Sequence, residues 1–101
     1  MVSLFALYRK PDDESAFLQH YETIHAPLAR QMPGILSLEW GRQELLFSPE
    51  ADPWFLVAEM RFSTRDAMMA ALNSPQGRAA GADLNGFARG LVIMRMVEWH
   101  D

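Results

Sequence analysis

Residues 11–34 read PDDESAFLQHYETIHAPLARQMPG, and this stretch sets the interpretation of the whole chain. Its acidic beginning suits the N-terminus of a helix, where carboxylates complement the helix dipole and Asp is a favoured cap. Apolar side chains then recur at helical spacing on one stripe, at Phe17, Tyr21, Ile24 and Leu28. Pro27 lacks an N–H group and clashes with the turn before it, so the helix should end or kink near His25–Ala26. We expect Pro27 to begin a final turn that stops at Pro33–Gly34.

Strand patterns lie on both sides of this helix. An apolar run rich in β-formers covers residues 2–8 and is closed by Pro11. Two further strands, residues 35–47 and 54–62, are joined by a short turn and predict a hairpin, with Gly41 as a candidate bulge in the first of them. In the second, Leu56, Ala58, Met60 and Phe62 are expected on one face, with Phe55, Val57, Glu59 and Arg61 on the other.

A second helical region and a last strand complete the chain. Residues 67–72 are strongly helical, and Ser74-Pro75 supplies a cap and a proline at the first position of a helix that runs to about Phe87. Residues 91–99 form the final strand pattern. The order strand, helix, strand, strand, helix, strand predicts one α+β domain over residues 1–101, with ferredoxin-like βαββαβ topology and a four-stranded antiparallel sheet.

Composition excludes several classes of function. The 101 residues carry a net charge of −4 and no Cys, so disulfides and thiolate sites are excluded. The basic residues are scattered rather than clustered, and we therefore expect no nucleic-acid partner. The apolar N-terminal run is too short for a signal peptide or a membrane span, so we expect no membrane association and a cytoplasmic location.

Apolar residues occupy both alternating sets of the predicted strands. In a fold with helices on one face of the sheet, the other face would then be apolar and exposed, and a second sheet would have to cover it. We therefore expect a homodimer that packs sheet against sheet. Glu59, Arg61 and Arg95 interrupt these strands; they either pair between subunits or lie near strand ends and reach water.

The most specific motifs resemble the EthD-like family, and the resemblance covers nearly the whole chain. It is carried by Tyr8-Arg9-Lys10-Pro11, Phe17-x-x-His20-Tyr21-x-x-x-His25-Ala26-Pro27-Leu28, Met32-Pro33-Gly34, Ser74-Pro75-x-Gly77, Ala82-Asp83-Leu84 and Phe87. The resemblance implies the dimeric α/β-barrel superfamily, whose members include cofactor-free monooxygenases, isomerases, cyclases and dehydratases. It also implies a cleft between sheet and helices that takes a small apolar or aromatic molecule. A fold of this kind does not specify one reaction.

His25 is the leading catalytic candidate. Helical geometry places it at the edge of the buried stripe and near a helix C-terminus, where an imidazole can exchange a proton with a bound phenol, enol or lactone. The family motif carries a His at this place. A structural His bonded to a carbonyl is the alternative. Tyr21, one turn earlier, is a candidate to orient a substrate oxygen, or else a core aromatic.

The remaining candidates are assigned to binding. Asp83 matches an acidic position of the family pattern and either orients His25 across the cleft or serves helix geometry. The expected wall residues are Phe5, Trp40, Leu56 and Phe87. His20 is expected at the opposite edge of the stripe from His25, and the two lack the i, i+4 spacing of a paired metal site, so we expect no metal and no cofactor. The sequence thus predicts a cofactor-free isomerase, dehydratase, cyclase or oxygenase, with a non-catalytic ligand-binding or structural dimer module as the alternative.

Overall fold

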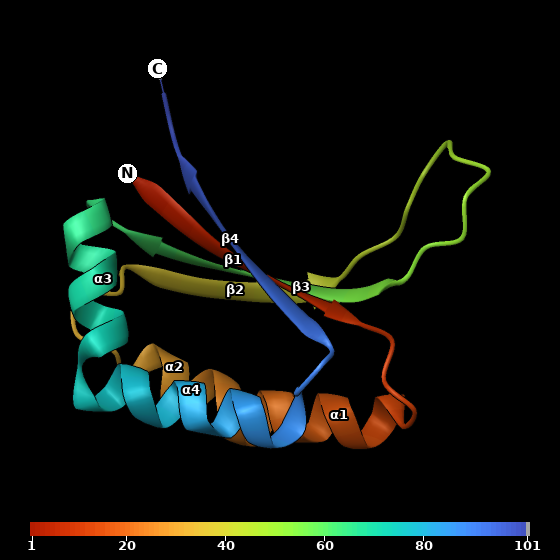
Figure 1. The fold of residues 1–101 in the computed structure, drawn as a ribbon, viewed down its shortest axis with the longest axis horizontal. Helices are drawn as coiled ribbons and strands as arrows, with labels where there is room; N and C mark the ends of the chain where they lie inside the picture. The colour runs from red at the N-terminus through yellow and green to blue at the C-terminus, as the bar shows by residue number, and fades with distance from the viewer. Residues whose placement is uncertain (101) are drawn as a thin grey trace.

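Two layers make up the molecule, a four-stranded antiparallel sheet and a layer of helices against one of its faces (Figure 1). The computed structural model describes residues 1–100. The strands are β1 (Val2–Arg9), β2 (Ser37–Arg42), β3 (Trp54–Phe62) and β4 (Val92–Glu98), in the sheet order β2-β3-β1-β4. This arrangement is the ferredoxin-like βαββαβ topology, and it confirms the fold class predicted from the sequence.

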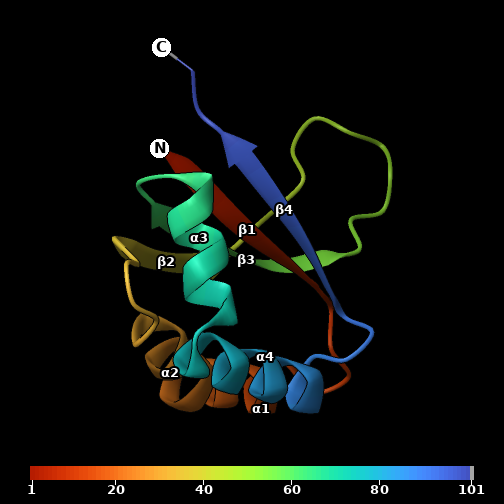
Figure 2. The same cartoon turned by 60° about the vertical axis from the view of Figure 1, so that its left-hand side comes forward.

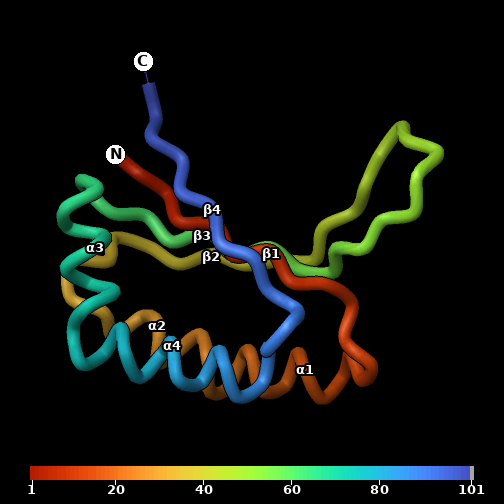
Figure 3. Tube along the Cα trace, in the orientation of Figure 1, coloured from red at the N-terminus to blue at the C-terminus, as the bar shows by residue number. Residues whose placement is uncertain are grey.

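The first connection is one continuous coil below the sheet (Figure 3). It comprises α1 (Glu14–His20), a π-helical segment η1 (Tyr21–His25) and α2 (Ala26–Arg30). The Asp13 carboxylate caps α1 by accepting a hydrogen bond from the Ala16 N–H at 3.0 Å. Pro27 lies in the first turn of α2, as expected from the sequence. The turn that follows contains Gly34 at φ +81°, a conformation that favours glycine.

The second connection consists of α3 (Arg65–Asn73) and α4 (Pro75–Phe87), which meet at a tight corner. Ser74 forms the corner: its hydroxyl donates to the Ala71 carbonyl at 2.5 Å and accepts from the Gly77 N–H at 3.0 Å. A Cβ atom on Gly77 would lie 2.2 Å from the Ala71 carbonyl oxygen, so this position needs glycine. The corner allows α4 to lie beside the first helical coil (Figure 2).

An aromatic cluster fills the space between the sheet and the first helical coil. The Phe17 ring is its centre, with centroid distances of 5.1 Å to Phe87, 5.5 Å to Tyr8, 5.9 Å to Phe55 and 6.5 Å to Tyr21. Tyr8 and Tyr21 are almost fully buried. Aromatic pairs in edge-to-face or offset-stacked arrangements add about 0.5–1.5 kcal/mol each to the effect of burial. The cluster therefore fixes how the helical coil is rotated against the sheet.

Three details of the hairpin differ from the sequence prediction. Strand β2 ends at Arg42, and residues 43–53 form a loop that rises from the sheet on the side away from the helices (Figure 1). Gly41 pairs in regular register with Val57, so it marks no bulge. The irregularity lies instead where β1 passes from Tyr8 to Arg9, opposite Phe55. That irregularity turns the Phe55 ring to the helix side, against Phe17, rather than to the opposite face.

The face of the sheet without helices carries both apolar and charged side chains. Its half-buried apolar members, identified from the strand register, are Phe5, Leu7, Val57, Ile93 and Val97. Glu59, Arg61 and Arg95 share this face, and the Glu59 carboxylate accepts from the Ser3 hydroxyl at 2.6 Å and from Arg61 Nε at 3.2 Å. None of the helices within residues 1–100 has the length and apolar character needed to cross a bilayer.

Candidate functional site

Three side chains from two helices meet on the helix side of the sheet. Asp83, in α4, lies between His20, the last residue of α1, and His25, the last residue of η1. Its Oδ1 atom is 2.8 Å from His20 Nε2, and its Oδ2 atom is 3.0 Å from both His20 Nε2 and His25 Nδ1. One carboxylate thus holds two imidazoles. A carboxylate accepts hydrogen bonds, so the ring nitrogens that face it carry protons and donate.

The π-helical segment brings the two histidines to the same side. Within η1 the Ala26 N–H donates to the Tyr21 carbonyl, five residues back instead of four. In such a wide turn, residues five apart lie nearly above one another, which is the spacing of His20 and His25. The Thr23 hydroxyl donates to the Gln19 carbonyl at 2.6 Å, which satisfies a backbone acceptor within this distorted stretch. Single π turns inside α-helices are frequent at functional sites.

The expectation that His20 and His25 lie at opposite edges of the helical stripe was therefore wrong. It assumed α-helical spacing throughout, and the wide turn alters the angular positions of the residues within it. Ile24, expected on the buried stripe, is 45% exposed, whereas His25 is 7% exposed. The sequence contains one sign of this change in Pro27, because a proline disturbs the hydrogen bonding of the turn before it.

His25 also lines a small cavity of about 70 Å³ between the helices and the sheet. The cavity wall is otherwise apolar or small and is made by Ala29, Met32, Met60, Leu72, Gly77, Ala80, Gly81, Leu84 and Met94. Because Nδ1 of His25 is engaged by Asp83, Nε2 is the ring nitrogen left for a ligand in this cavity. In this tautomer Nε2 carries a lone pair and can accept a proton.

Opposing effects determine how readily His25 becomes charged. Burial is the largest, and it lowers the pKa of His25 below its ordinary value because an imidazolium is poorly solvated there. The hydrogen bond and the negative charge of Asp83 act in the opposite direction and raise this pKa. The nearby His20 lowers it. The net effect is a lower pKa, so His25 is a neutral base at neutral pH.

Two of the sequence candidates pack around the imidazoles. The Phe87 ring lies 4.5 Å from the His20 ring and 5.0 Å from the His25 ring, measured between centroids, so it supports both. Tyr21 is 1% exposed, and its ring packs against His25 at 5.5 Å and edge-on to Trp40 at 5.0 Å. Burial raises the pKa of Tyr21 to about 12, although Arg30 and the Tyr8 hydroxyl act against this shift. Tyr21 and Trp40 therefore lie behind the histidine, outside the residues that line its cavity.

None of the four expected wall residues lines the cavity: Phe87 packs against the imidazoles, Trp40 lies behind them, and the other two are farther away. Phe5 is on the face of the sheet without helices, because it pairs with Glu59 and Arg95 in the strand register. Leu56 is fully buried in the core and does not line the cavity. Its truncation to Ala is expected to cost about 2–5 kcal/mol of stability. Strand periodicity places residues on faces, but it does not say which face the helices cover.

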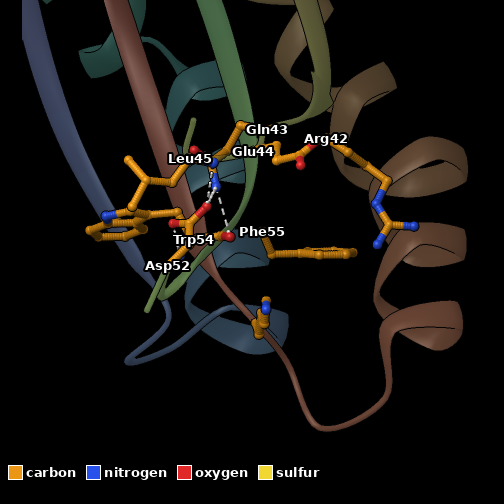
Figure 4. Close-up of a pocket in the computed structure, with 8 residues that line it drawn as sticks. Arg42, Gln43, Glu44, Leu45, Asp52, Trp54 and Phe55 are labelled. Carbon is orange, nitrogen blue, oxygen red and sulfur yellow. Dashed lines mark hydrogen bonds between the residues drawn. The ribbon is translucent and has the colours of Figure 1, made fainter. Parts of the chain in front are cut away.

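A larger hollow of about 380 Å³ lies at the base of the 43–53 loop, at the end of β2 (Figure 4). Several of its polar groups bind one another. The Asp52 carboxylate accepts from the Gln43 side chain at 2.8 Å, from the Leu45 N–H at 2.9 Å and from the Trp54 N–H at 3.1 Å. The bond from Gln43 is the largest of the effects that lower the pKa of Asp52. These hydrogen bonds hold the loop in place. The hollow is therefore a weaker candidate for a functional site than the His25 cavity.

Sequence reasoning identified His25, Asp83 and Phe87 but gave His20 no role. His20 lies beside His25 only because of the π turn, and Asp83 reaches both because α4 packs alongside η1. The sign of this arrangement in the sequence is the pair of histidines, which lie five positions apart and are followed at once by Ala26-Pro27.

The chain is similar to known proteins over almost its whole length. The EthD domain model matches residues 9–90. An 11.0 kDa protein from the thcB-thcC intergenic region of Rhodococcus erythropolis is 32% identical, over 93% of this chain and 90% of that protein. The crystal structure of an EthD family protein from Bacillus halodurans is 34% identical with a TM-score of 0.89, and the match covers 99% of each chain.

More distant structures show the fold alone. A DABB family protein with a ferredoxin-like fold from Mesorhizobium loti is 15% identical with a TM-score of 0.77, over 99% of this chain and 97% of that one. A dimeric ferredoxin-like protein from Thermobifida fusca is 16% identical with a TM-score of 0.72, over 97% and 90% of the two chains. With the family model matching residues 9–90 and a relative 32% identical over nearly the whole chain, this protein belongs to the EthD family.

Proposed function

We propose that this EthD family protein is a cofactor-free acid-base enzyme that acts on a small apolar or aromatic molecule, with His25 as the group that carries the proton. The observation that carries the proposal is the orientation of His25: Asp83 holds Nδ1 at 3.0 Å while the ring lines an apolar cavity. An imidazole oriented by a carboxylate is a common general base, because the carboxylate fixes the tautomer and stabilises the imidazolium.

The chemistry open to this site is movement of a proton on a weakly acidic carbon or oxygen. His25 Nε2 would accept the proton from the substrate, and the resulting imidazolium would keep its Nδ1–H on Asp83. The same proton can then return to another atom of the substrate, which gives an isomerisation, a dehydration or the closure of a ring. Burial favours this use, because a base whose pKa is lowered is neutral and available at neutral pH.

The wall of the cavity supports a small apolar ligand. A cavity of about 70 Å³ is smaller than the roughly 150 Å³ that holds benzene in an apolar protein cavity. Met32, Met60 and Met94 line it, and methionine side chains rearrange easily. Met94 is 42% exposed and belongs to the edge strand β4, so its movement would open the cavity outward. The small volume of the cavity also fits the alternative of a structural dimer module, whereas a non-catalytic binding module would hold an intact ligand there.

We also propose that the protein works as a homodimer through the face of the sheet without helices. Five apolar side chains of this face are half-buried in the single chain, and the loop with the exposed Leu45, Leu46 and Phe47 rises on the same side. Apolar surface of this extent is usually covered by a partner. Several proteins of the same fold are described as dimeric, among them the one from Thermobifida fusca.

Proton exchange on carbon tests the proposed reaction without knowledge of the natural substrate. The probes are a small aryl ketone and an unsaturated γ-lactone in D₂O, and proton NMR follows deuterium incorporation next to the carbonyl. We expect the protein to accelerate exchange and His25→Asn, which keeps a donor to Asp83 but lacks Nε2, to lose on the order of 10²-fold. His100→Asn, at an exposed position near the C-terminus, is the matched control. Equal acceleration by His25→Asn would exclude His25 as the proton carrier.

A further inference from the structure

We infer that His20 is a positioning residue of the His25 site: it holds Asp83 from the solvent side, and its charge sets how readily His25 takes up a proton. This inference rests on the proposed function for its role in catalysis. Its physical content, a coupling between two histidines through one carboxylate, does not depend on that function.

The first support is geometric. His20 Nε2 lies 2.8 Å and 3.0 Å from the two oxygens of Asp83, so it contacts the carboxylate more fully than His25 does. The Oδ2 atom is shared, at 3.0 Å from His20 Nε2 and from His25 Nδ1. A carboxylate held by two rings has little freedom to rotate, so removing either ring changes the orientation of the other.

The second support is the gradient of exposure across the three side chains. Counting side-chain atoms alone, the exposed fractions are 30% for His20, 17% for Asp83 and 8% for His25. His20 borders a hollow next to Asp12 and Asp13, whereas His25 lines the apolar cavity. The outer ring is therefore open to water while the inner ring faces the cavity. Phe87 lies against both rings and keeps them in place.

His20 is the second imidazole in contact with Asp83, and the other ionisable side chains around the site are phenols and one guanidinium. Tyr8 faces the site from β1 and Tyr21 from η1, and burial raises the pKa of both phenols far above neutrality, so they stay uncharged. Arg30 of α2 acts on Tyr21 and lowers the pKa of that phenol against the effect of burial. When His20 is protonated, it offsets the negative charge of Asp83 and repels a second proton on His25. When His20 is neutral, Asp83 stabilises the His25 imidazolium fully.

Titration of the imidazole protons by NMR tests the inference without any substrate. In the unmodified protein we expect the His25 resonances to show two steps, because the charge of His20 alters the His25 equilibrium. In His20→Gln, whose amide can still donate to Asp83, we expect a single step displaced to higher pH. His100→Gln is the matched control and should leave the His25 curve unchanged, since His100 is exposed near the C-terminus.

Asp83→Asn keeps the inference falsifiable if His20→Gln disturbs the fold. We expect both histidines to titrate in single, independent steps in this variant. A single-step His25 curve in the unmodified protein, or an unchanged His25 curve in a folded His20→Gln variant, would overturn the coupling. Two-step titration without any acceleration of proton exchange on the ketone and lactone would support the coupling and refute the proposed reaction instead, so the two failures are distinguishable.

Discussion

The Nδ1 atom of His25 and the Oδ2 atom of Asp83 lie 3.0 Å apart, although 58 residues separate them in the chain. Two helices from different halves of the βαββαβ fold supply them, and the corner at Ser74 places α4 where Asp83 reaches η1. This contact orients the inner imidazole and leaves its other nitrogen for the cavity. The first two predictions below test its electrostatics, and the others test the α3–α4 corner, the proposed dimer face and the cavity.

Asp83→Asn should lower the pKa of His25 further. The carboxylate raises this pKa through its hydrogen bond and its charge, and the amide keeps only the ability to accept a hydrogen bond. The pH midpoint of catalysed proton exchange on the aryl ketone should therefore move to lower pH, and the rate at neutral pH should fall because the base is weaker. An unchanged midpoint would show that Asp83 does not interact electrostatically with His25.

Folding stability should depend on the charge of His25 at acid pH. Its pKa is lower in the folded chain than in the unfolded chain, so the unfolded chain binds more protons below the ordinary histidine value of about 6.5. The free energy of unfolding should therefore fall as the pH falls through this range. Urea unfolding at pH 7.5 and pH 5.0 measures the effect. His25→Asn removes the titrating group and should show a smaller fall; an equal fall would contradict the lowered pKa.

Gly77→Ala should destabilise the protein by about 1–3 kcal/mol through overpacking. The new methyl group would lie 2.2 Å from the Ala71 carbonyl oxygen and 2.5 Å from that of Leu72, both of them backbone atoms at the α3–α4 corner. Gly86→Ala in the same helix is the matched control, because nothing lies within 4 Å of its added methyl group. It should stabilise α4 by about 0.5–1 kcal/mol, since Ala is the better helix former. Equal effects of the two changes would show that the corner is not tightly packed.

Val57→Lys should convert the proposed dimer to a monomer. Val57 is half-buried at the middle of the face without helices, next to Leu7 across the strand pair, and a lysine there would place an unpaired charge in the interface. Ile24→Lys is the matched control, because Ile24 is 45% exposed in the helix layer, on the opposite side of the sheet. Sedimentation velocity should give a dimer for the control and a monomer for the test variant. A dimer in both would place the interface elsewhere.

Gly81→Leu should block the cavity beside His25. Gly81 lines this cavity, and a methyl group added there meets nothing within 4 Å, so a longer side chain can enter the empty space without disturbing the helix. Saturation-transfer NMR with the aryl ketone should show loss of binding. Gly86→Leu changes the same residue type at an exposed position of α4 and should retain it. Retained binding by both variants would mean that the ketone binds outside the cavity.

Much of the fold follows from local patterns, and the errors have definite causes. The alternation in residues 54–62 predicts β3 with its bounds, and Ser74-Pro75 predicts the beginning of α4. Phe55 was assigned to the wrong face because the irregularity opposite it depends on pairing with β1, which a single strand pattern does not contain. Strand β2 was predicted five residues too long at its C-terminal end, because the Asp52 carboxylate draws residues 43–45 into the loop.

The residues of the candidate site were likewise predicted only in part. His25, Asp83 and Phe87 were named from the sequence, and the structure brings all three together, with Tyr21 and Trp40 packed behind them. Phe5 and Leu56 lie elsewhere, since the wall of a cavity depends on which face of the sheet the helices cover. The alternation of residues along a strand does not by itself show whether Phe5 and Leu56 line the cavity.

The sequence by itself determined the order of the elements, the fold class and the EthD resemblance, because propensity, capping and hydrophobic spacing act over a few residues. Only the tertiary structure decided that His20 and His25 share Asp83. That contact requires the π turn ahead of Pro27 and the approach of α4 at the Gly77 corner. The contact itself joins segments 58 and 63 residues apart in the chain, and no local pattern records such a distance.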